Sequence, residues 1–167
     1  MKQVFVKEQD VVNAAQEGCD EFVDLFVKAI YESIGENLNQ EALQTLNADQ
    51  ITLLAYVILR DEVMDGGFVQ LIHNGYGEFI FRNPFAKMMR IWGIDELAKL
   101  VNKARKPFDH HHEEIEAVCS DEDFMALFER MPEFDDFDDC FVENEEEWTE
   151  AVAHYVDEHI DRFAQIV

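Results

Sequence analysis

Proline and glycine are scarce in this sequence. Of its 167 residues, three are proline and seven are glycine. Because these two residues interrupt helices more than any others, few positions break the chain. Apolar side chains recur at three- and four-residue intervals through most of the sequence, which is typical of amphipathic helices. The sequence therefore predicts an all-α fold.

Cysteine and long apolar runs are also rare. Cys19, Cys119 and Cys140 lie far apart without CxxC spacing, so we expect buried thiols rather than a disulfide framework. No stretch approaches the roughly 18–20 apolar residues that cross a bilayer. The first residues also lack an apolar run of signal-peptide length. We therefore expect a cytoplasmic protein with no membrane contact.

Basic residues are the third deficit. The sequence has 37 acidic and 13 basic side chains, which gives a formal net charge of −24. Between Pro107 and Val167, two basic residues, Arg130 and Arg162, stand against 21 acidic ones. Such a field opposes direct binding to nucleic acid or anionic membranes and attracts basic proteins. Because aromatic and aliphatic residues are interleaved with the acids, we expect a folded region rather than a disordered tail.

The helical pattern predicts one compact bundle of about seven to nine helices, with long N- and C-terminal helices. We expect a single acidic helical domain over residues 1–167. Asp10 is the expected first N-cap, Asn47 and Gln50 form a capping box, and the 95–106 helix ends before Pro107. Asp121 is the expected cap of the seventh helix. The predicted helices span residues 10–30, 51–63, 68–74, 84–92, 95–106, 112–118, 121–131, 137–143 and 147–166.

Two motifs suggest metal chemistry. The first is the tract His110-His111-His112-Glu113-Glu114, whose side chains are common metal ligands. His112 and Glu116 are four residues apart, so they would share one face of a helix. The second histidine of an HExxH motif is absent. The aspartates at 135–139 lack the glycine and spacing of a calcium loop. A small metal-dependent hydrolase using His110–His112 stays open as an alternative. Our first hypothesis contains no catalytic residue, no cofactor, no metal and no enzymatic activity.

The acidic side chains between residues 135 and 150 are best treated as a set. Helical residues three or four apart have Cβ atoms about 5–6 Å apart, and duplex DNA carries one charge per about 1.7 Å of axis. Rows of carboxylates can imitate that density, although a merely solubilising acidic surface is the alternative. The predicted partner-binding carboxylates are Asp135, Asp136, Asp138, Asp139, Glu143, Glu145, Glu146, Glu147 and Glu150. The predicted inward-facing anchors are Phe134, Phe137, Phe141, Trp148, Val152, Tyr155 and Val156.

The segment from Glu62 to Gly77 resembles the signature of a bacterial family of acidic helical proteins that includes a DNA mimic. That pattern runs Glu-Val, a polar residue, Gly-Gly-Phe, one residue, Gln, then Asn and Gly. The Asp-rich stretch from Pro132 to Phe141 resembles the family as well. The resemblance implies an all-helical fold in which signature residues hold the structure. The signature residues are Glu62, Gly66, Gly67, Phe68, Gln70, Asn74 and Gly77.

The charge and the resemblance together suggest a function. We expect a non-enzymatic protein whose acidic C-terminal third occupies the DNA-binding surface of a basic protein, such as a transcription regulator or nucleoid protein. An immunity protein against a basic toxin would use the same electrostatic attraction, with the toxin as its partner. A homodimer is also open.

Overall fold

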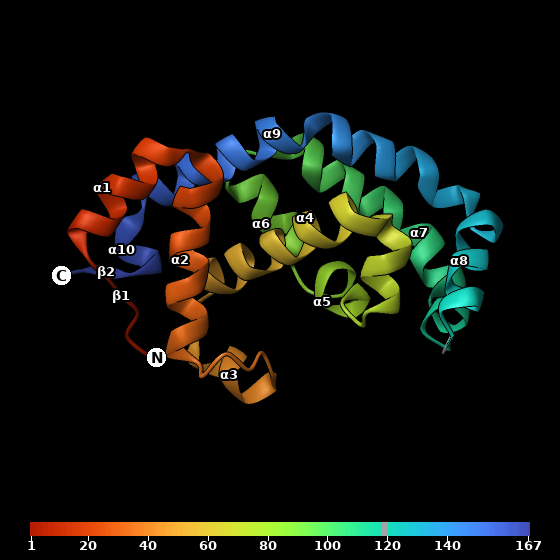
Figure 1. Cartoon of the computed structure of the whole chain (residues 1–167), viewed down its shortest axis with the longest axis horizontal. Helices are drawn as coiled ribbons and strands as arrows, with labels where there is room; N and C mark the ends of the chain where they lie inside the picture. Colours follow the sequence, from red (N-terminus) through yellow and green to blue (C-terminus); the bar gives the residue numbers. More distant parts are fainter. Residues whose placement is uncertain (118–119) are drawn as a thin grey trace. The chain divides into compact units, whose positions relative to one another are not determined.

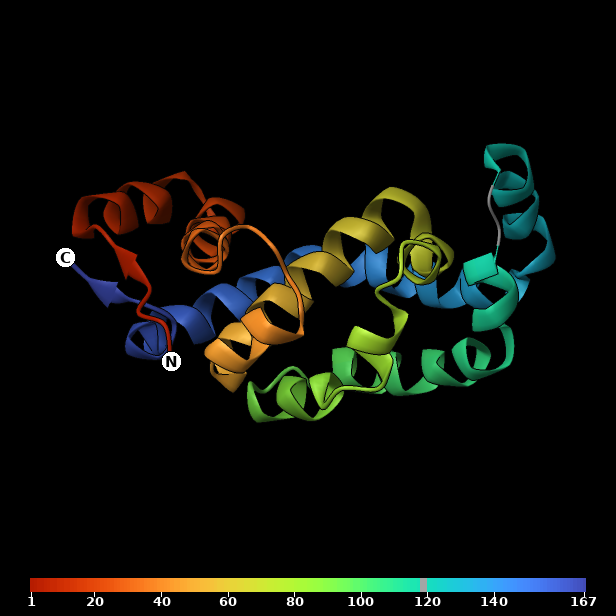
Figure 2. The same cartoon turned by 90° about the horizontal axis from the view of Figure 1, so that it is seen from below.

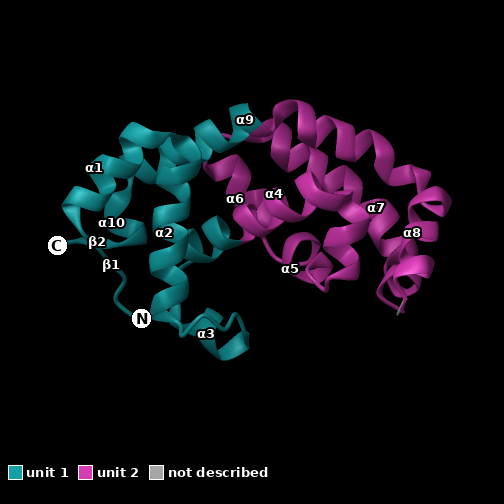
Figure 3. Cartoon of the chain, viewed as in Figure 1, with its two compact units in different colours: residues 1–54, 146–167 teal, residues 55–145 magenta. Residues whose placement is uncertain are grey.

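The computed structural model describes residues 1–117 and 120–167, drawn in Figure 1. The described residues form ten α-helices, one short 3-10 helix and one pair of two-residue strands, which confirms the all-α prediction. The chain divides into two compact units, residues 1–54 with 146–167, and residues 55–145 (Figure 3). The single-domain expectation stays a prediction. Within the described residues, no helix combines the length and apolar character needed to span a bilayer.

The first unit joins both ends of the chain. Strand β1 (Phe5–Val6) pairs in parallel with β2 (Gln165–Ile166), and the two strands lie side by side in Figures 1 and 2. This unit also contains α1 (Glu8–Glu17), α2 (Cys19–Ser33), α3 (Gln40–Thr45) and α10 (Ile160–Phe163). Helices α4 (Ala48–His73) and α9 (Asp135–Glu158) contribute residues to both units.

The capping box at the start of α4 is confirmed. The backbone N–H of Gln50 donates to Asn47 Oδ1 over 2.8 Å, and the backbone N–H of Asn47 donates to Gln50 Oε1 over 3.0 Å. The Gln50 side-chain amide also donates to the Phe163 carbonyl. The cap therefore gives hydrogen-bond acceptors to backbone N–H groups at the start of α4 and connects this end of the helix to the C-terminal segment.

The predicted long N-terminal helix is divided in two. Gly18 separates α1 from α2 with a φ of 153° and a ψ of −179°, which no helix contains. The first helix begins at Glu8 rather than after Asp10. Apolar spacing continues from Ala14 to Phe22 across the break, so periodicity alone does not reveal it.

The second unit is built around stacked phenylalanines. It contains most of α4, then α5 (Gly77–Phe81), α6 (Phe85–Ile91), α7 (Asp95–Ala117), α8 (Asp121–Arg130), the 3-10 helix η1 (Pro132–Phe134) and the first part of α9. Phe68 lies 6.1 Å from Phe81 and 6.5 Å from Phe134 between ring centroids, and Phe81 lies 4.7 Å from Phe108. All four rings are buried, and such burial stabilises a fold by about 1.5–3 kcal/mol per side chain.

Three predicted boundaries in this half of the chain are wrong. Helix α7 runs through Pro107 and merges the predicted 95–106 and 112–118 helices. Proline removes one helical hydrogen bond, but Pro107 and Phe108 are buried, so packing offsets the local penalty. The predicted 137–143 and 147–166 helices are one helix, α9, which ends at Glu158. Ser120, not Asp121, caps α8 and accepts the N–H of Asp123.

Two side-chain predictions are also corrected. Cys19 is exposed at the start of α2 and Cys140 is half-buried, so the buried-thiol prediction is wrong for Cys19. Cys119 and Val118 lie outside the described residues. Phe137 is half-buried, whereas the other six predicted anchors are buried.

Candidate partner-binding surface

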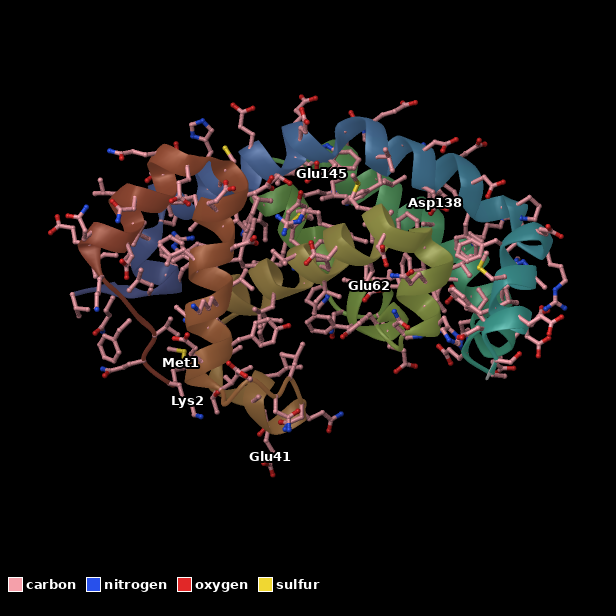
Figure 4. The ribbon with its side chains drawn as sticks, in the orientation of Figure 1. Met1, Lys2, Glu41, Glu62, Asp138 and Glu145 are labelled. Carbon is pink, nitrogen blue, oxygen red and sulfur yellow. The ribbon has the colours of Figure 1, made fainter. Side chains whose placement is uncertain are left out.

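All nine predicted partner-binding carboxylates lie on α9. Asp138 and Glu145, both labelled in Figure 4, are half-buried. The other seven are exposed to solvent: Asp135, Asp136, Asp139, Glu143, Glu146, Glu147 and Glu150.

The exposed carboxylates of α9 are spaced as rows. Asp135, Asp139 and Glu143 follow one another at four-residue steps, and so do Glu146 and Glu150 further along. Four residues advance a helix by about 6 Å, whereas one DNA strand carries a charge per about 3.4 Å of axis. One row therefore has roughly half the linear charge of one DNA strand, and the remaining acids beside it raise that density.

These seven side chains carry charge that no basic residue in the described part of the chain neutralises. Within residues 1–117 and 120–167, none of them forms an ion pair with a basic side chain. Other exposed acids do: Asp61 pairs with Arg60, and Asp109 with Arg82. Like charges this close repel one another and destabilise the helix. The exposed face of α9 is therefore a source of negative potential available to an outside cation.

Asp138 differs from its neighbours on α9. Its Oδ1 accepts the backbone N–H of Phe68 over 2.8 Å. The pKa of its carboxyl is raised to about 6 in all: burial raises it most, the Phe68 hydrogen bond lowers it, and the charges of Asp135 and Asp139 raise it. Asp138 thus caps the short helical turn after the break in α4. Asp138 is therefore half-buried and bound to the fold, and its predicted contact with a partner stays a prediction.

The break in α4 lies where the sequence predicts it. Gly66 and Gly67 leave helical geometry, and Gly67 has a φ of 74° and a ψ of −177°. A Cβ on Gly67 would lie 2.5 Å from Asp138 Oδ2, and one on Gly66 would overlap the Gln70 side chain. Glycine is therefore required here for both backbone conformation and space.

Polar signature residues bridge this break. Glu62, labelled in Figure 4, accepts hydrogen bonds from the side-chain amides of Gln70 (3.0 Å) and Asn74 (2.8 Å). Asp65 accepts a second hydrogen bond from Gln70. Gly77 lies against the Phe108 ring with no room for a Cβ. Six of the seven residues named from the resemblance thus lie at or next to one kink, where Asp138 joins them from α9, and Gly77 packs on Phe108 instead.

The histidines of the tract at 110–112 make separate contacts and do not converge on one point. His111 Nε2 contacts Glu133, and His112 Nδ1 lies 3.5 Å from Glu116 Oε1. The His112 ring also packs on Phe108 at 5.0 Å between centroids, while His110 is exposed. Among residues 1–117 and 120–167, no cluster of three or more His, Cys, Asp or Glu side chains has an arrangement suited to a metal ion.

Comparison with known proteins identifies the family to which this sequence belongs. The sequence model of the DMP19-like proteins matches residues 44–159. The chain belongs to the DMP19-like family. A relative from Neisseria meningitidis serogroup B, named DNA mimic protein DMP19, is 38% identical over 127 residues, which are 75% of this chain and 77% of the relative. The family match includes the kink in α4 and all of α9, whereas α1 and α2 lie outside it.

Proposed function

We propose that this protein is a non-enzymatic DNA mimic that occupies the DNA-binding surface of a basic protein, such as a transcription regulator or nucleoid protein. The observation that supports this most is the set of seven exposed α9 carboxylates, which have no basic partner in the part of the chain that the structure describes. The name of the 38% identical relative points the same way. The proposed site of action is the cytoplasm, where such regulators bind DNA.

The proposed mechanism is electrostatic competition. A DNA-binding surface presents lysine and arginine side chains that neutralise phosphates. Carboxylates already ordered on a helix meet these cations without a new folding cost, and their field speeds the encounter. Because the contacts are between exposed charges, binding weakens steeply as salt screens them.

The test is capture followed by competition. The immobilised protein is exposed to a lysate of the source cells at low and at high salt, and captured proteins are identified. Each is then assayed for duplex DNA binding with increasing amounts of this protein. We expect a basic DNA-binding protein that is released by salt and loses its DNA in proportion to the competitor. Recovery of no such protein, or capture that salt does not affect, would contradict the proposal.

Capture and elemental analysis separate the alternatives. A captured basic toxin that loses its activity, rather than a regulator, would support the immunity interpretation. Elemental analysis of the purified protein tests the metal-dependent hydrolase, which requires stoichiometric metal near His110–His112.

A further inference from the structure

The first unit contains a surface hollow beside the exposed face of α9. It has a volume of about 310 Å³. Its apolar wall is formed by Ala15, Phe22 and Ala153, and its acidic side by Glu150 and Asp157 of α9. This volume is at the small end of the roughly 300–1,000 Å³ range of ligand sites. The hollow is therefore suited to one side chain rather than to a large substrate.

The break at Gly18 shapes this hollow. Gly18 and Cys19 line it at the point where α1 ends and α2 begins. The φ of 153° at Gly18 turns the chain between the two helices and favours glycine. A continuous helix, as the periodicity predicts, would lack this corner.

The electrostatic potential at the hollow is negative. Partial burial raises the pKa of the Cys19 thiol, and the carboxylates of Glu150, Asp20 and Glu21 raise it further. These acids come from α2 as well as α9. His154 is also part of the lining, and its ring is a cation only when protonated. An anionic occupant is therefore disfavoured, and a cationic one is attracted.

We propose that the hollow is a docking site for one arginine side chain of the basic partner. The proposal rests on the proposed function, since a surface that binds DNA phosphates presents arginines. An arginine stem packs on apolar side chains while its planar guanidinium pairs with carboxylates and stacks on aromatic rings. The wall from α1 and α2 lies outside the residues matched by the family, 44–159. The hollow thus adds a shape-dependent contact to the charged face of α9.

A small probe tests the hollow without knowledge of the partner. N-acetyl-arginine amide is titrated into the full-length protein, and the methyl signals of Ala15 and Ala153 are followed by NMR. N-acetyl-citrulline amide, which has nearly the same shape without the charge, is the matched probe. The exposed Ala126 methyl on α8 reports general attraction to the acidic surface.

We expect saturable shifts at Ala15 and Ala153 with the arginine probe and none with the citrulline probe. Glu150→Gln and Asp157→Asn should each weaken the apparent affinity about two- to fivefold, as for exposed ion pairs. Ala15→Leu should abolish the shift at Ala153 by filling the hollow without changing the charge. Glu41→Gln is the control, since Glu41 is exposed on α3 and does not line the hollow, and it should leave the titration unchanged.

Equal shifts with both probes, or arginine shifts that do not saturate, would overturn the docking site. So would an Ala15→Leu variant that binds the probe as the wild type does. If the arginine probe binds but no DNA-binding protein is captured from the lysate, the docking site stands and the DNA-mimic function fails. If a partner is captured but the probe does not bind in the hollow, the mimic function stands and this inference fails.

Discussion

Two sets of carboxylates in the second unit show how differently one residue type is used. At the kink of α4, Glu62 and Asp138 are half-buried and accept hydrogen bonds from Asn74 and from the backbone N–H of Phe68. On the exposed face of α9, Asp135 and Asp139 flank Asp138 in sequence but have no basic partner among the described residues. Asp138 and its neighbours on α9 therefore have different roles according to the direction each side chain faces. The inward group holds the fold, and the outward group supplies the field.

Gly67→Ala is the change expected to disturb the kink most. It forces a side chain into a conformation reserved for glycine, which costs about 1–3 kcal/mol, and displaces the Asp138 carboxylate from Phe68, at about another 1–2 kcal/mol. We expect urea denaturation to show a loss of roughly 3–4 kcal/mol in the free energy of unfolding. Gly35→Ala is the matched control, because Gly35 has a φ of 72° but open space around it. It should cost about 1 kcal/mol, and equal losses in both variants would contradict the close contact with Asp138.

Asp138→Ala tests the division between the two sets directly. The Phe68 N–H loses its side-chain acceptor, so we expect the free energy of unfolding to fall by about 1–2 kcal/mol. Asp139→Ala, one residue along and exposed, should change stability by less than about 0.5 kcal/mol. Partner binding should show the opposite order, with Asp139→Ala the weaker binder. A stability loss that is the same for both would remove the distinction between inward and outward carboxylates.

The pH dependence of stability gives a finer test of Asp138. Its pKa is about 6 in the folded protein against 3.8 as the ordinary value, so the folded state binds this proton more tightly than the unfolded state does. Its contribution to stability is therefore complete below the unfolded pKa and is lost as pH rises through about 6. Asp138→Asn keeps an oxygen acceptor and cannot titrate.

The expected result is that wild type gains more stability than Asp138→Asn between pH 7.5 and pH 5, measured by urea denaturation. Protonation of the other acids at low pH relieves their repulsion in both proteins. That effect cancels when the stability gain of Asp138→Asn is subtracted from that of the wild type. Identical pH profiles for the two proteins would show that the Asp138 pKa is not raised in the folded state.

Local signals in the sequence predict the features that depend on local contacts. The Asn47–Gln50 capping box and the break at Gly66-Gly67 lie as expected because their donors, acceptors and backbone geometry involve neighbouring residues. The course of α7 through Pro107 could not be predicted, because it depends on burying Phe108 against residues of α5.

The candidate partner-binding surface is also only partly predictable from the sequence. The sequence places all nine candidate carboxylates in one acidic stretch, and the structure puts them on one helix. It does not separate Asp138 from the rest, because the partner that distinguishes Asp138 is the Phe68 N–H, 70 residues away in sequence. The hollow at Gly18 is hidden for the same reason, since its two walls come from opposite ends of the chain.

The central claim is that the outward carboxylates of α9 bind the partner and the inward ones hold the fold. Its most direct test compares two variants, each with six exposed acids changed to Asn or Gln, in affinity for the captured partner at low salt. The first changes Asp135, Asp136, Asp139, Glu143, Glu146 and Glu147. The second changes Glu8, Asp10, Glu17, Glu32, Glu36 and Glu41, which are exposed residues of the N-terminal segment.

Both variants lose the same formal charge, so they differ in where the charge is lost. At about 0.5 kcal/mol per exposed contact, the α9 variant should lose roughly 3 kcal/mol, or on the order of 100-fold in affinity. It should stay folded, because Asp138 and the kink are intact. The N-terminal variant should remain within about fivefold of the wild type, since none of its six acids is on α9 and charges outside the contact surface act only through a screened field. Equal loss of affinity in the two variants would contradict the claim and leave net charge, rather than the face of α9, as the determinant of binding.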